Sequence, residues 1–428
     1  MFVSINHFQG IFVYLKMNIF SYLKNELIRG SLILFILINI GNFINYLFQF
    51  SMARMLGPSD YSILAVISSI VYIFMIPTNS IQAVVSKYST KANVEDKLGK
   101  IKYMLGYLIK KNIFIGLIGF MIFTILSIFL SVLLKIDFLV LGLTGFMIFG
   151  LLISPVSIGI LQGMKRFKIW GWNFIIGSGF KLLIAIILVF IGFGVYGAVI
   201  GLISGVFISF FLVFPFIKDV LKAKEKRIYR EIKIFQRKDV YDFLIILFIV
   251  LIYSIDVILA KGFFSSEIAG EYAVASMIGK IILLSSMAIT YAMFPISSEK
   301  FVRGDKTKSM IKKTGISLML ICIIAVLFLF FFPKQVILIL FGSQYLNSSN
   351  IVLYIGIAFS LIALLNFLIF YRVSLDKIKI REVILLASFF GLLVVMLSLF
   401  HDTILQFSIV FMISTIIMLL LSILVFRK

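Results

Sequence analysis

The stretch NIFIGLIGFMIFTILSIFLSVLL at residues 112–134 decides the fold, because it runs for 23 residues without a charged side chain. A helix that crosses the hydrocarbon core of a bilayer needs about 20 mostly apolar residues. A transmembrane β-strand is about 10 residues long and alternates apolar with polar side chains, which this stretch does not do. Only helices and closed barrels satisfy their backbone groups in lipid, so the sequence predicts a membrane-spanning helix here.

Apolar stretches of similar length lie on both sides of this one. Together the predicted helices occupy residues 31–52, 61–85, 112–134, 138–161, 169–192, 195–217, 241–260, 272–294, 314–333, 351–371, 382–400 and 403–426. Twelve spans use roughly 240–260 residues, which leaves short loops for the rest of the chain. The sequence therefore predicts an all-α integral membrane protein with twelve transmembrane helices.

The composition of the whole chain agrees with this fold class. Of its 428 residues, 62% are hydrophobic and 14% are charged, and the mean hydropathy is +1.16. A soluble domain is about half apolar and about a quarter charged, so a soluble enzyme and a nucleic-acid-binding domain are excluded. One cysteine, Cys322, and two histidines suggest neither an internal disulfide nor a metal site. We expect no cofactor and no catalytic residue.

The basic residues predict the orientation in the membrane. The net charge of +22 comes from 40 Lys and Arg against 18 Asp and Glu. With the N-terminus in the cytoplasm, the cytoplasmic segments hold 34 of the 40 basic residues and the outer segments hold four. Lys and Arg are retained on the cytoplasmic side, so this split supports twelve helices with both termini in the cytoplasm of a multi-pass cell-membrane protein. It also explains the positive charge without a nucleic-acid partner.

The two halves of the chain resemble each other weakly. YSILAVISS from Tyr61 matches YAVASMIGK from Tyr272 at an offset of 211 residues, and LQGMKRFKI (161–169) matches RVSLDKIKI (372–380) at the same offset. Two halves of six helices keep the same orientation, so they form a parallel repeat, as in some transporter folds. The predicted units are a cytoplasmic N-terminal segment (1–30), an N-terminal lobe (31–217), a basic cytoplasmic linker (218–240) and a C-terminal lobe (241–428).

Four segments carry a resemblance to a known family. They are NxxNYLFQFSMARMLGPSDY (42–61), LQGMKRF (161–167), IDVILAKGFFSSEIAGEYAVAS (255–276) and LFGSQYL (340–346). In this order, they resemble prokaryotic polysaccharide flippases of the multidrug, oligosaccharidyl-lipid and polysaccharide exporter superfamily. The resemblance implies a V-shaped transporter whose two six-helix lobes enclose a central cavity, lined largely by the predicted helices at 31–52, 61–85, 241–260 and 272–294.

The same resemblance implies the activity. Such a transporter moves a polyprenyl-linked oligosaccharide from the cytoplasmic to the outer leaflet by alternating access, for surface polysaccharide or glycan biosynthesis. No phosphate-binding loop of the GxxxxGK[ST] type is present, so transport is expected to be secondary, downhill or driven by a partner.

Two lysines inside predicted spans are candidates for substrate binding. Lys280 lies near the middle of the span at 272–294, and Lys181 near the middle of the span at 169–192. A lysine at the bilayer centre costs roughly 2.5–3.5 kcal/mol, so we expect both to face a watery cavity and bind the diphosphate of the substrate. The alternative is a structural lysine that reaches the interface or pairs with a carbonyl.

Asp256 is the acid that lies well inside a span, five residues before Lys261. One reading is a proton or cation site that couples transport to a gradient, or a partner that releases Lys280 when it is protonated. The other reading is a buried ion pair, with Lys261 or Lys280, that holds helices together.

Four polar residues on the first span are spaced by three or four positions: Asn39, Asn42, Asn45 and Gln49. This spacing predicts a single stripe on one helix face. Amides on such a stripe can bond sugar hydroxyls in a cavity. The alternative is hydrogen bonding between packed helices, at about 0.6 kcal/mol each.

Two further positions concern movement and the outer mouth. Pro77, which precedes Asn79 and Gln82, predicts a kink and a plausible hinge in the second span. Arg54, near Asp60 at the outer end of the first span, predicts a phosphate clamp or gate residue, because its forked donors suit phosphate. The alternative for Arg54 is an interfacial anchor.

Two other functions stay open from the sequence. One is a cation-coupled exporter of drugs or small molecules with the same fold, although its usual coupling acid in the first lobe has no counterpart in these spans. The other is a non-transporting membrane scaffold in glycan assembly. The expected partners are the polyprenyl-phosphate-linked glycan, membrane lipids, and glycosyltransferases or a polymerase of the same pathway.

Overall fold

Helices make up almost all of the structure. The computed structural model describes residues 26–95, 97–224, 237–302, 308–375, 378 and 380–427, and no strand occurs within these ranges. The first half contains α2 (Glu26–Val94), α3 (Leu98–Leu134), α4 (Phe138–Gly163), α5 (Phe167–Leu188), η1 (Val189–Phe193), α6 (Gly194–Leu212), η2 (Phe214–Ile217) and α7 (Lys218–Lys222). The second half contains α8 (Arg237–Phe263), α9 (Ser266–Val302), α10 (Lys308–Phe331), α11 (Pro333–Leu340), η3 (Ser343–Asn350), α12 (Val352–Ser374), α13 (Ile380–Leu399) and α14 (Ile404–Arg427).

The all-α prediction is therefore confirmed for the described part of the chain. Most of the predicted N-terminal segment (1–30) and of the predicted linker (218–240) lies outside the described residues.

Ten helical segments among the described residues are long and apolar enough to cross a membrane, where the sequence predicts twelve. The difference comes from two segments, Ile33–Val94 with 62 residues and Phe167–Lys222 with 56 residues, each of which contains two predicted spans. At 1.5 Å per residue, each extends about 80–90 Å, well beyond the ~30 Å hydrocarbon core. Each also contains a glycine with positive φ, Gly57 (φ 74°) and Gly192 (φ 102°), where the helix breaks. Glycine adopts this conformation without steric cost.

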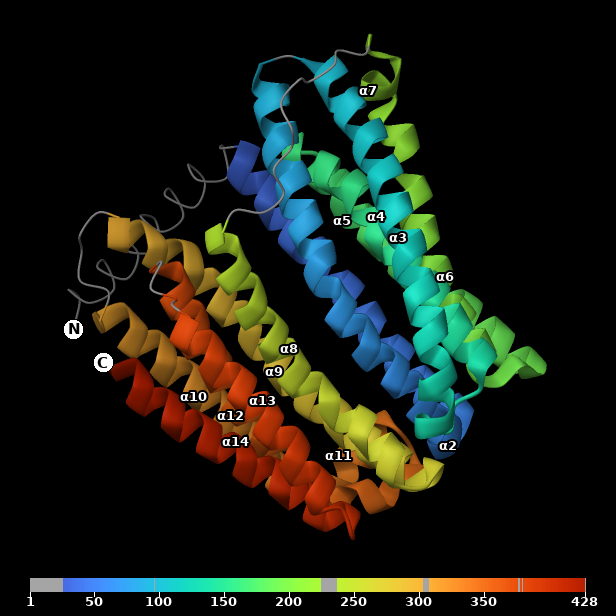
Figure 1. The fold of residues 1–428 in the computed structure, drawn as a ribbon, viewed down its shortest axis with the longest axis vertical. Coiled ribbons are helices and arrows are strands. Elements are labelled where there is room, and N and C mark those ends of the chain that lie inside the picture. Colours follow the sequence, from blue (N-terminus) through green and yellow to red (C-terminus); the bar gives the residue numbers. More distant parts are fainter. Residues whose placement is uncertain are drawn as a thin grey trace, which may run out of the picture.

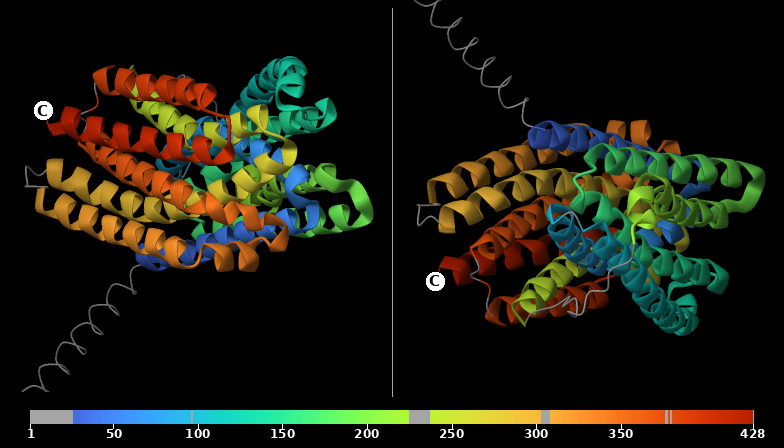
Figure 2. Two further views of the ribbon diagram at one scale, coloured as in Figure 1. Left: turned by 90° about the horizontal axis from the view of Figure 1, so that it is seen from below. Right: turned by 90° about the horizontal axis from the view of Figure 1, so that it is seen from above.

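The helices form two groups (Figure 1). Helices α2 to α7, which we call the N-lobe, lie on one side, and α8 to α14, the C-lobe, lie on the other. The lobes meet at one end, where the break in α2 lies close to α11, and their other ends spread apart (Figure 1). We call the first the junction end and the second the basic end. In the perpendicular views of Figure 2 the two groups overlap, with the beginning of α2 alongside helices of the C-lobe.

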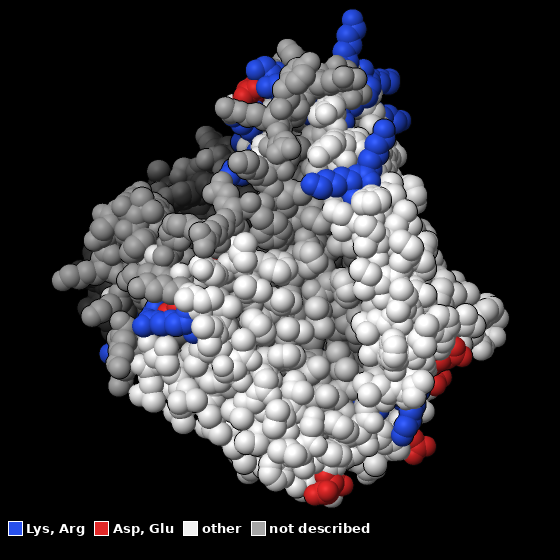
Figure 3. Space-filling view, viewed as in Figure 1, with Lys and Arg blue, Asp and Glu red and all other residues white. Residues whose placement is uncertain are grey.

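The surface has the character expected in a bilayer. Large apolar side chains are exposed along the helices, among them Val132 and Phe190. Lys and Arg gather over the far end of the N-lobe, while the surface between the two ends is almost free of charged side chains (Figure 3). Apolar surface of this extent and ten candidate spans identify a multi-pass membrane protein.

One short turn at the junction end is fixed by a carboxylate. Asp137 precedes α4 and accepts a hydrogen bond from the backbone N–H of Leu139 at 2.8 Å, as N-terminal caps do. The hydroxyl of Tyr196 donates to the same carboxylate at 2.7 Å. These two donors hold the pKa of Asp137 below its ordinary value. The turn between α3 and α4 is thereby tied to α6.

Two glycines bring α4 against the second half of α2. A methyl group on Gly159 would lie 2.8 Å from the carbonyl oxygen of Gln82, and one on Gly163 would lie 2.6 Å from that of Ser86. The spacing of four residues is the small-xxx-small pattern that lets membrane helices approach closely. The glycine of the LQGMKRF segment, Gly163, is therefore required by packing inside the N-lobe.

Gly163→Ala is expected to lower the free energy of unfolding by about 1–3 kcal/mol, because the methyl group overlaps backbone that cannot move aside easily. Denaturation of the purified protein in detergent measures this change. Gly142→Ala in the same helix is the control, since a methyl group there meets nothing within 4 Å. Equal stability of the two variants would contradict the proposed close approach.

Candidate functional site

One face of the first half of α2 points toward the C-lobe. At the junction end the ring of Phe50 packs edge-on against Phe341 with centroids 5.3 Å apart, and the carbonyl of Ala53 accepts a hydrogen bond from Tyr345. Asn42 and Asn39 are placed eight and eleven residues before Phe50, which returns each of them to this face of a helix. Both asparagines are exposed. The amide nitrogen of Asn39 donates to the carbonyl of Phe35, one turn earlier in the same helix, at 2.8 Å.

Asn45 turns from this face toward α5. Its amide oxygen accepts a short hydrogen bond from the ammonium group of Lys181. The same ammonium group lies 4.5 Å from the centroid of the Phe48 ring, a cation–π contact. Lys181 is partly exposed, and no carboxylate pairs with it among the described residues. The N-lobe thus holds a cation inside a span whose partners are neutral.

Gln49 departs from the predicted stripe. Its amide nitrogen donates to the hydroxyl of Ser68 at 3.4 Å, and its oxygen accepts from Tyr61 at 3.3 Å. Both partners lie on the second half of α2, so Gln49 ties the two halves together. The four predicted amides therefore divide: Asn39 and Asn42 are exposed, Asn45 holds Lys181, and Gln49 is engaged within the N-lobe.

The predicted hinge at Pro77 lies in continuous helix. Gly57 is the position within α2 at which the backbone leaves helical geometry. Next to the proline, the hydroxyl of Thr78 bonds the carbonyl of Leu151 in α4 at 3.1 Å. The nearby Gln82 donates to Gln162 of α4 at 3.0 Å. In this conformation the segment is attached to α4, and bending at Pro77 stays a prediction.

The structure brings Asp256 and Lys280 together. Lys280 Nζ lies 3.4 Å from Asp256 Oδ1, and the hydroxyl of Ser276 donates to the other carboxylate oxygen. Both charged side chains are buried, and the ammonium group lies 5.7 Å from the Phe359 ring centroid. The pair therefore sits inside the C-lobe, among α8, α9 and α12. Of the two partners predicted for Asp256, the structure selects Lys280.

Lys261 lies instead at the contact between the lobes. Its ammonium group donates to Ser62 of α2 at 2.9 Å and to Ser266 of α9 at 2.6 Å. The side chain is buried, with 1% of the residue exposed. Lys261 therefore joins the C-lobe to the N-lobe at the junction end.

Arg54 lies at the same end. It belongs to the N-lobe and donates hydrogen bonds to the C-lobe, whereas Lys261 donates from the C-lobe to the N-lobe. Its guanidinium donates to the carbonyl of Leu338 at 3.3 Å and to that of Ile339, both on α11. The predicted gate position is thus occupied by a contact between the lobes. Its phosphate-clamp reading stays a prediction.

Apart from Lys261, sequence reasoning did not single out the C-lobe residues of the contact between the lobes. Gln344 and Tyr345 bond the end of the first half of α2, and Tyr72 meets Tyr253 edge-on with centroids 6.2 Å apart. The segment LFGSQYL contains Gln344 and Tyr345, so its resemblance to the family drew attention to these residues. It did not indicate which groups they bond. Their partners are backbone carbonyls, which no side-chain pattern marks.

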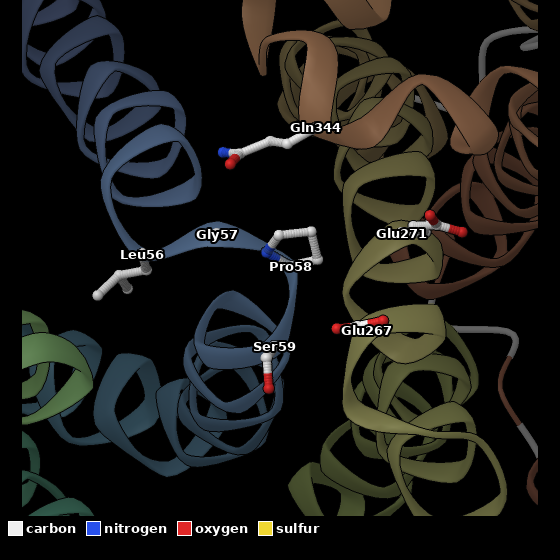
Figure 4. Close-up of a pocket in the computed structure, with 7 residues that line it drawn as sticks. All are labelled: Leu56, Gly57, Pro58, Ser59, Glu267, Glu271 and Gln344. Carbon is white, nitrogen blue, oxygen red and sulfur yellow. The ribbon is translucent and has the colours of Figure 1, made fainter.

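A shallow pocket of about 300 Å³ opens beside this contact (Figure 4). It is lined by Leu56, Gly57, Pro58, Ser59, Glu267, Glu271 and Gln344. Figure 4 shows Gln344 extending toward the end of the first half of α2, and Pro58 turned toward α9. Among the described residues, no group of three or more His, Cys, Asp or Glu side chains is placed to hold a metal ion.

Comparisons with solved structures establish the fold. The chain matches an inward-facing multidrug resistance MATE family transporter of the MOP superfamily with a TM-score of 0.67 and 13% identity, covering 89% of this chain and 93% of the other. It matches a MOP superfamily transporter from Pyrococcus furiosus with a TM-score of 0.64 and 14% identity, covering 93% and 94%. It matches the lipid II flippase MurJ in an inward closed conformation with a TM-score of 0.64 and 13% identity, covering 93% and 88%.

Comparison with protein families establishes the relationship in sequence. No curated protein matches the chain. The family model described as polysaccharide biosynthesis protein matches residues 51–350, which contain most of the four segments that carry the resemblance. The chain belongs to the polysaccharide biosynthesis protein family and has the fold of the MOP superfamily transporters.

Proposed function

We propose that this protein is a flippase that moves a polyprenyl-linked oligosaccharide from the cytoplasmic to the outer leaflet by alternating access, for surface polysaccharide or glycan biosynthesis. The observation that carries the proposal is Lys181, a cation within a span that is held by the neutral amide of Asn45. An ammonium group in lipid is costly unless a counter-ion reaches it. The diphosphate of the carrier lipid is an anion that belongs in the membrane and would supply that charge.

The surroundings of Lys181 suit the rest of such a substrate. Asn39 and Asn42 are exposed on the adjoining face of α2 and offer donors and acceptors to sugar hydroxyls. Amides carry no charge and can both donate and accept hydrogen bonds, so they can bind the hydroxyl groups of many different sugars. The family membership of the chain and its MOP superfamily fold support the same class of substrate.

The distribution of basic residues indicates the orientation of the protein in the membrane. We propose that the basic end lies in the cytoplasm, because Lys and Arg are retained there. Segments Ile33–Val94 and Phe167–Lys222 each cross twice in this proposal, which gives twelve crossings and two lobes at 31–217 and 241–428, joined by the linker at 218–240. Lobes that spread at the basic end then admit a substrate from the cytoplasmic leaflet.

This orientation predicts the side on which inserted tags are found. A tag within 225–232 and a tag after Lys428 are both expected to report the cytoplasm, and a tag near Asn347 is expected to report the outer side. Accessibility to a membrane-impermeant reagent in intact cells measures each one. A tag at 225–232 or at the C-terminus that is reached from outside would contradict the twelve-crossing arrangement.

Substitution of Lys181 tests the substrate site. Lys181→Met keeps the length of the side chain and removes its charge, so flipping of a fluorescent polyprenyl-diphosphate oligosaccharide in proteoliposomes should fall at least about tenfold, the value of one charged hydrogen bond. Lys181→Arg should retain part of the activity, since the charge persists in a different geometry.

Lys110→Met is the matched control, because it removes the same charge from an exposed position on α3. Its flipping rate should equal that of the parent protein. Unchanged flipping by Lys181→Met would contradict the assignment of Lys181 to the diphosphate.

We further propose that the pair of Asp256 and Lys280 couples transport to a proton or cation gradient. An ion pair buried in one lobe changes its charge when a proton or a cation reaches the carboxylate, and that change alters the packing of α8 against α9. Removal of the carboxylate alone leaves a buried ammonium group without a partner, which costs about 3–5 kcal/mol.

Asp256→Asn is therefore expected to lower stability by about this amount, and Asp256→Asn with Lys280→Met is expected to restore it. The double variant should transport without dependence on pH or sodium gradients, since neither remaining side chain titrates. Gradient-dependent flipping by a stable double variant would show that the pair is structural.

The two alternatives make different predictions from the same variants. The presence of a carboxylate within a span, Asp256, favours a cation-coupled exporter of small molecules. Such an exporter would still move a small cationic substrate in the Lys181→Met variant. A non-transporting scaffold would show no flipping activity, either in the parent protein or in the Lys181→Met variant. Glycosyltransferases or a polymerase of the same pathway are the proposed protein partners.

A further inference from the structure

The first half of α2 ends at the junction end with carbonyl groups that its own helix cannot satisfy. The helix breaks at Gly57, and residue 58 is proline, which has no N–H to donate to the carbonyl of Arg54. Gln344 of the C-lobe supplies the missing donor, with its amide nitrogen 3.2 Å from the carbonyl oxygen of Arg54 and 3.0 Å from that of Ala53. The hydroxyl of Tyr345 donates to the Ala53 carbonyl at 2.9 Å.

A second helix ends beside it and is capped from the other lobe. Helix α11 ends at Leu340, so its last carbonyls, among them those of Leu338 and Ile339, lack intrahelical donors. Arg54 of the N-lobe donates to both. A cation also interacts favourably with the negative end of a helix dipole. Each lobe therefore caps a helix C-terminus of the other.

Gly270 lets the two lobes come close enough for these caps to form. It lies in the first turns of α9, and a methyl group there would lie 2.8 Å from the Cα atom of Pro58 and closer still to its carbonyl. Glycine is unfavourable inside a helix, so its presence here agrees with a close approach of α9 to the turn at Pro58. Any larger side chain would separate α9 from the turn at Gly57 and Pro58.

The direct hydrogen-bond acceptors in this contact are neutral, although the carboxylate of Asp60 in the N-lobe also attracts Lys261. Arg54, Gln344 and Tyr345 donate to backbone carbonyls, and Lys261 donates to the hydroxyl of Ser62. Bonds of this kind can be exchanged for bonds to water at little cost, whereas a charge pair cannot be separated so easily. Neutral acceptors therefore make this contact easier to open than ion pairs would.

We propose that these reciprocal caps and the Gly270–Pro58 approach form a latch that holds the junction end closed and sets the ratio of closed to open molecules. The latch acts on the conformational equilibrium itself, so it is independent of the identity of the substrate. When the lobes part at this end, water takes the place of each cap.

The experiment measures the distance between the lobes at the junction end. Spin labels are attached at Ile191→Cys in η1, which leads to Gly194 beside Asp60, and at Asp402→Cys, next to His401, which stacks on Phe263. The protein also carries Cys322→Ser and is reconstituted without substrate. The parent protein should show mainly a short distance by pulsed electron paramagnetic resonance. Gly270→Ala should raise the ratio of long to short distances at least about tenfold, as overpacking of a close contact does.

A second variant keeps the test decisive if Gly270→Ala does not fold. Gln344→Glu has the same shape but turns two acceptors toward the carbonyls of Ala53 and Arg54, so it should also favour the long distance. The controls are Gly262→Ala, whose methyl group would lie 3.8 Å from Leu134, and Asn347→Ala, whose amide bonds Glu271 of its own lobe.

Both controls should keep the distance distribution of the parent protein. A parent-like distribution in folded Gly270→Ala, or in Gln344→Glu when Gly270→Ala is not folded, would overturn the latch. So would an equal shift in the controls, since it would show that any change at this end separates the lobes. Flipping assays are not needed for this result, so a failed substrate assignment leaves it intact.

Discussion

A polar backbone in a hydrocarbon interior must satisfy its N–H and C=O groups within the protein, and the rest of this structure depends on that constraint. The described chain meets it with helices that run from one end of the molecule to the other, and two long helical segments break within their length, at Gly57 and Gly192. Where a helix stops, its last carbonyls need partners from elsewhere. At the junction end those partners come from the opposite lobe. The same contacts therefore satisfy the backbone carbonyls and join the two lobes.

Charges and neutral groups are distributed differently within the lobes and between them. Asp256 and Lys280 form an ion pair inside the C-lobe, while Arg54 and Lys261 reach across to carbonyl and hydroxyl oxygens. A buried ion pair resists separation because each charge alone is costly. A boundary that must open is better made from neutral acceptors, which water can replace. Lys181 belongs to neither set, and this is the reason to regard it as a site for an anion from outside the protein.

Much of the fold could be predicted from the sequence because it depends on average properties. Length of apolar stretches and the distribution of lysine and arginine do not require knowledge of any particular contact. The site was harder, since side-chain direction decides it. Asn42 and Gln49 share a spacing that suggests one stripe, yet Gln49 turns to Ser68 because α2 folds back on itself at Gly57. The end of that helix at Arg54 needed caps from Gln344, a residue 290 positions away, and no local pattern marks a partner at that distance.

The lengths of α3 and α9 give the molecule a mechanical property. Each has 37 residues and runs from the junction end, which makes it about 55 Å long. While the proposed latch is closed, such a rod works as a lever arm, and a rotation of ten degrees about the junction end carries its far tip through about 10 Å. A change of a few tenths of an ångström where Gly270 meets Pro58 is amplified along the rod in the same way. In the proposed transport cycle, small and local chemistry at the junction end would be converted into a wide displacement at the basic end.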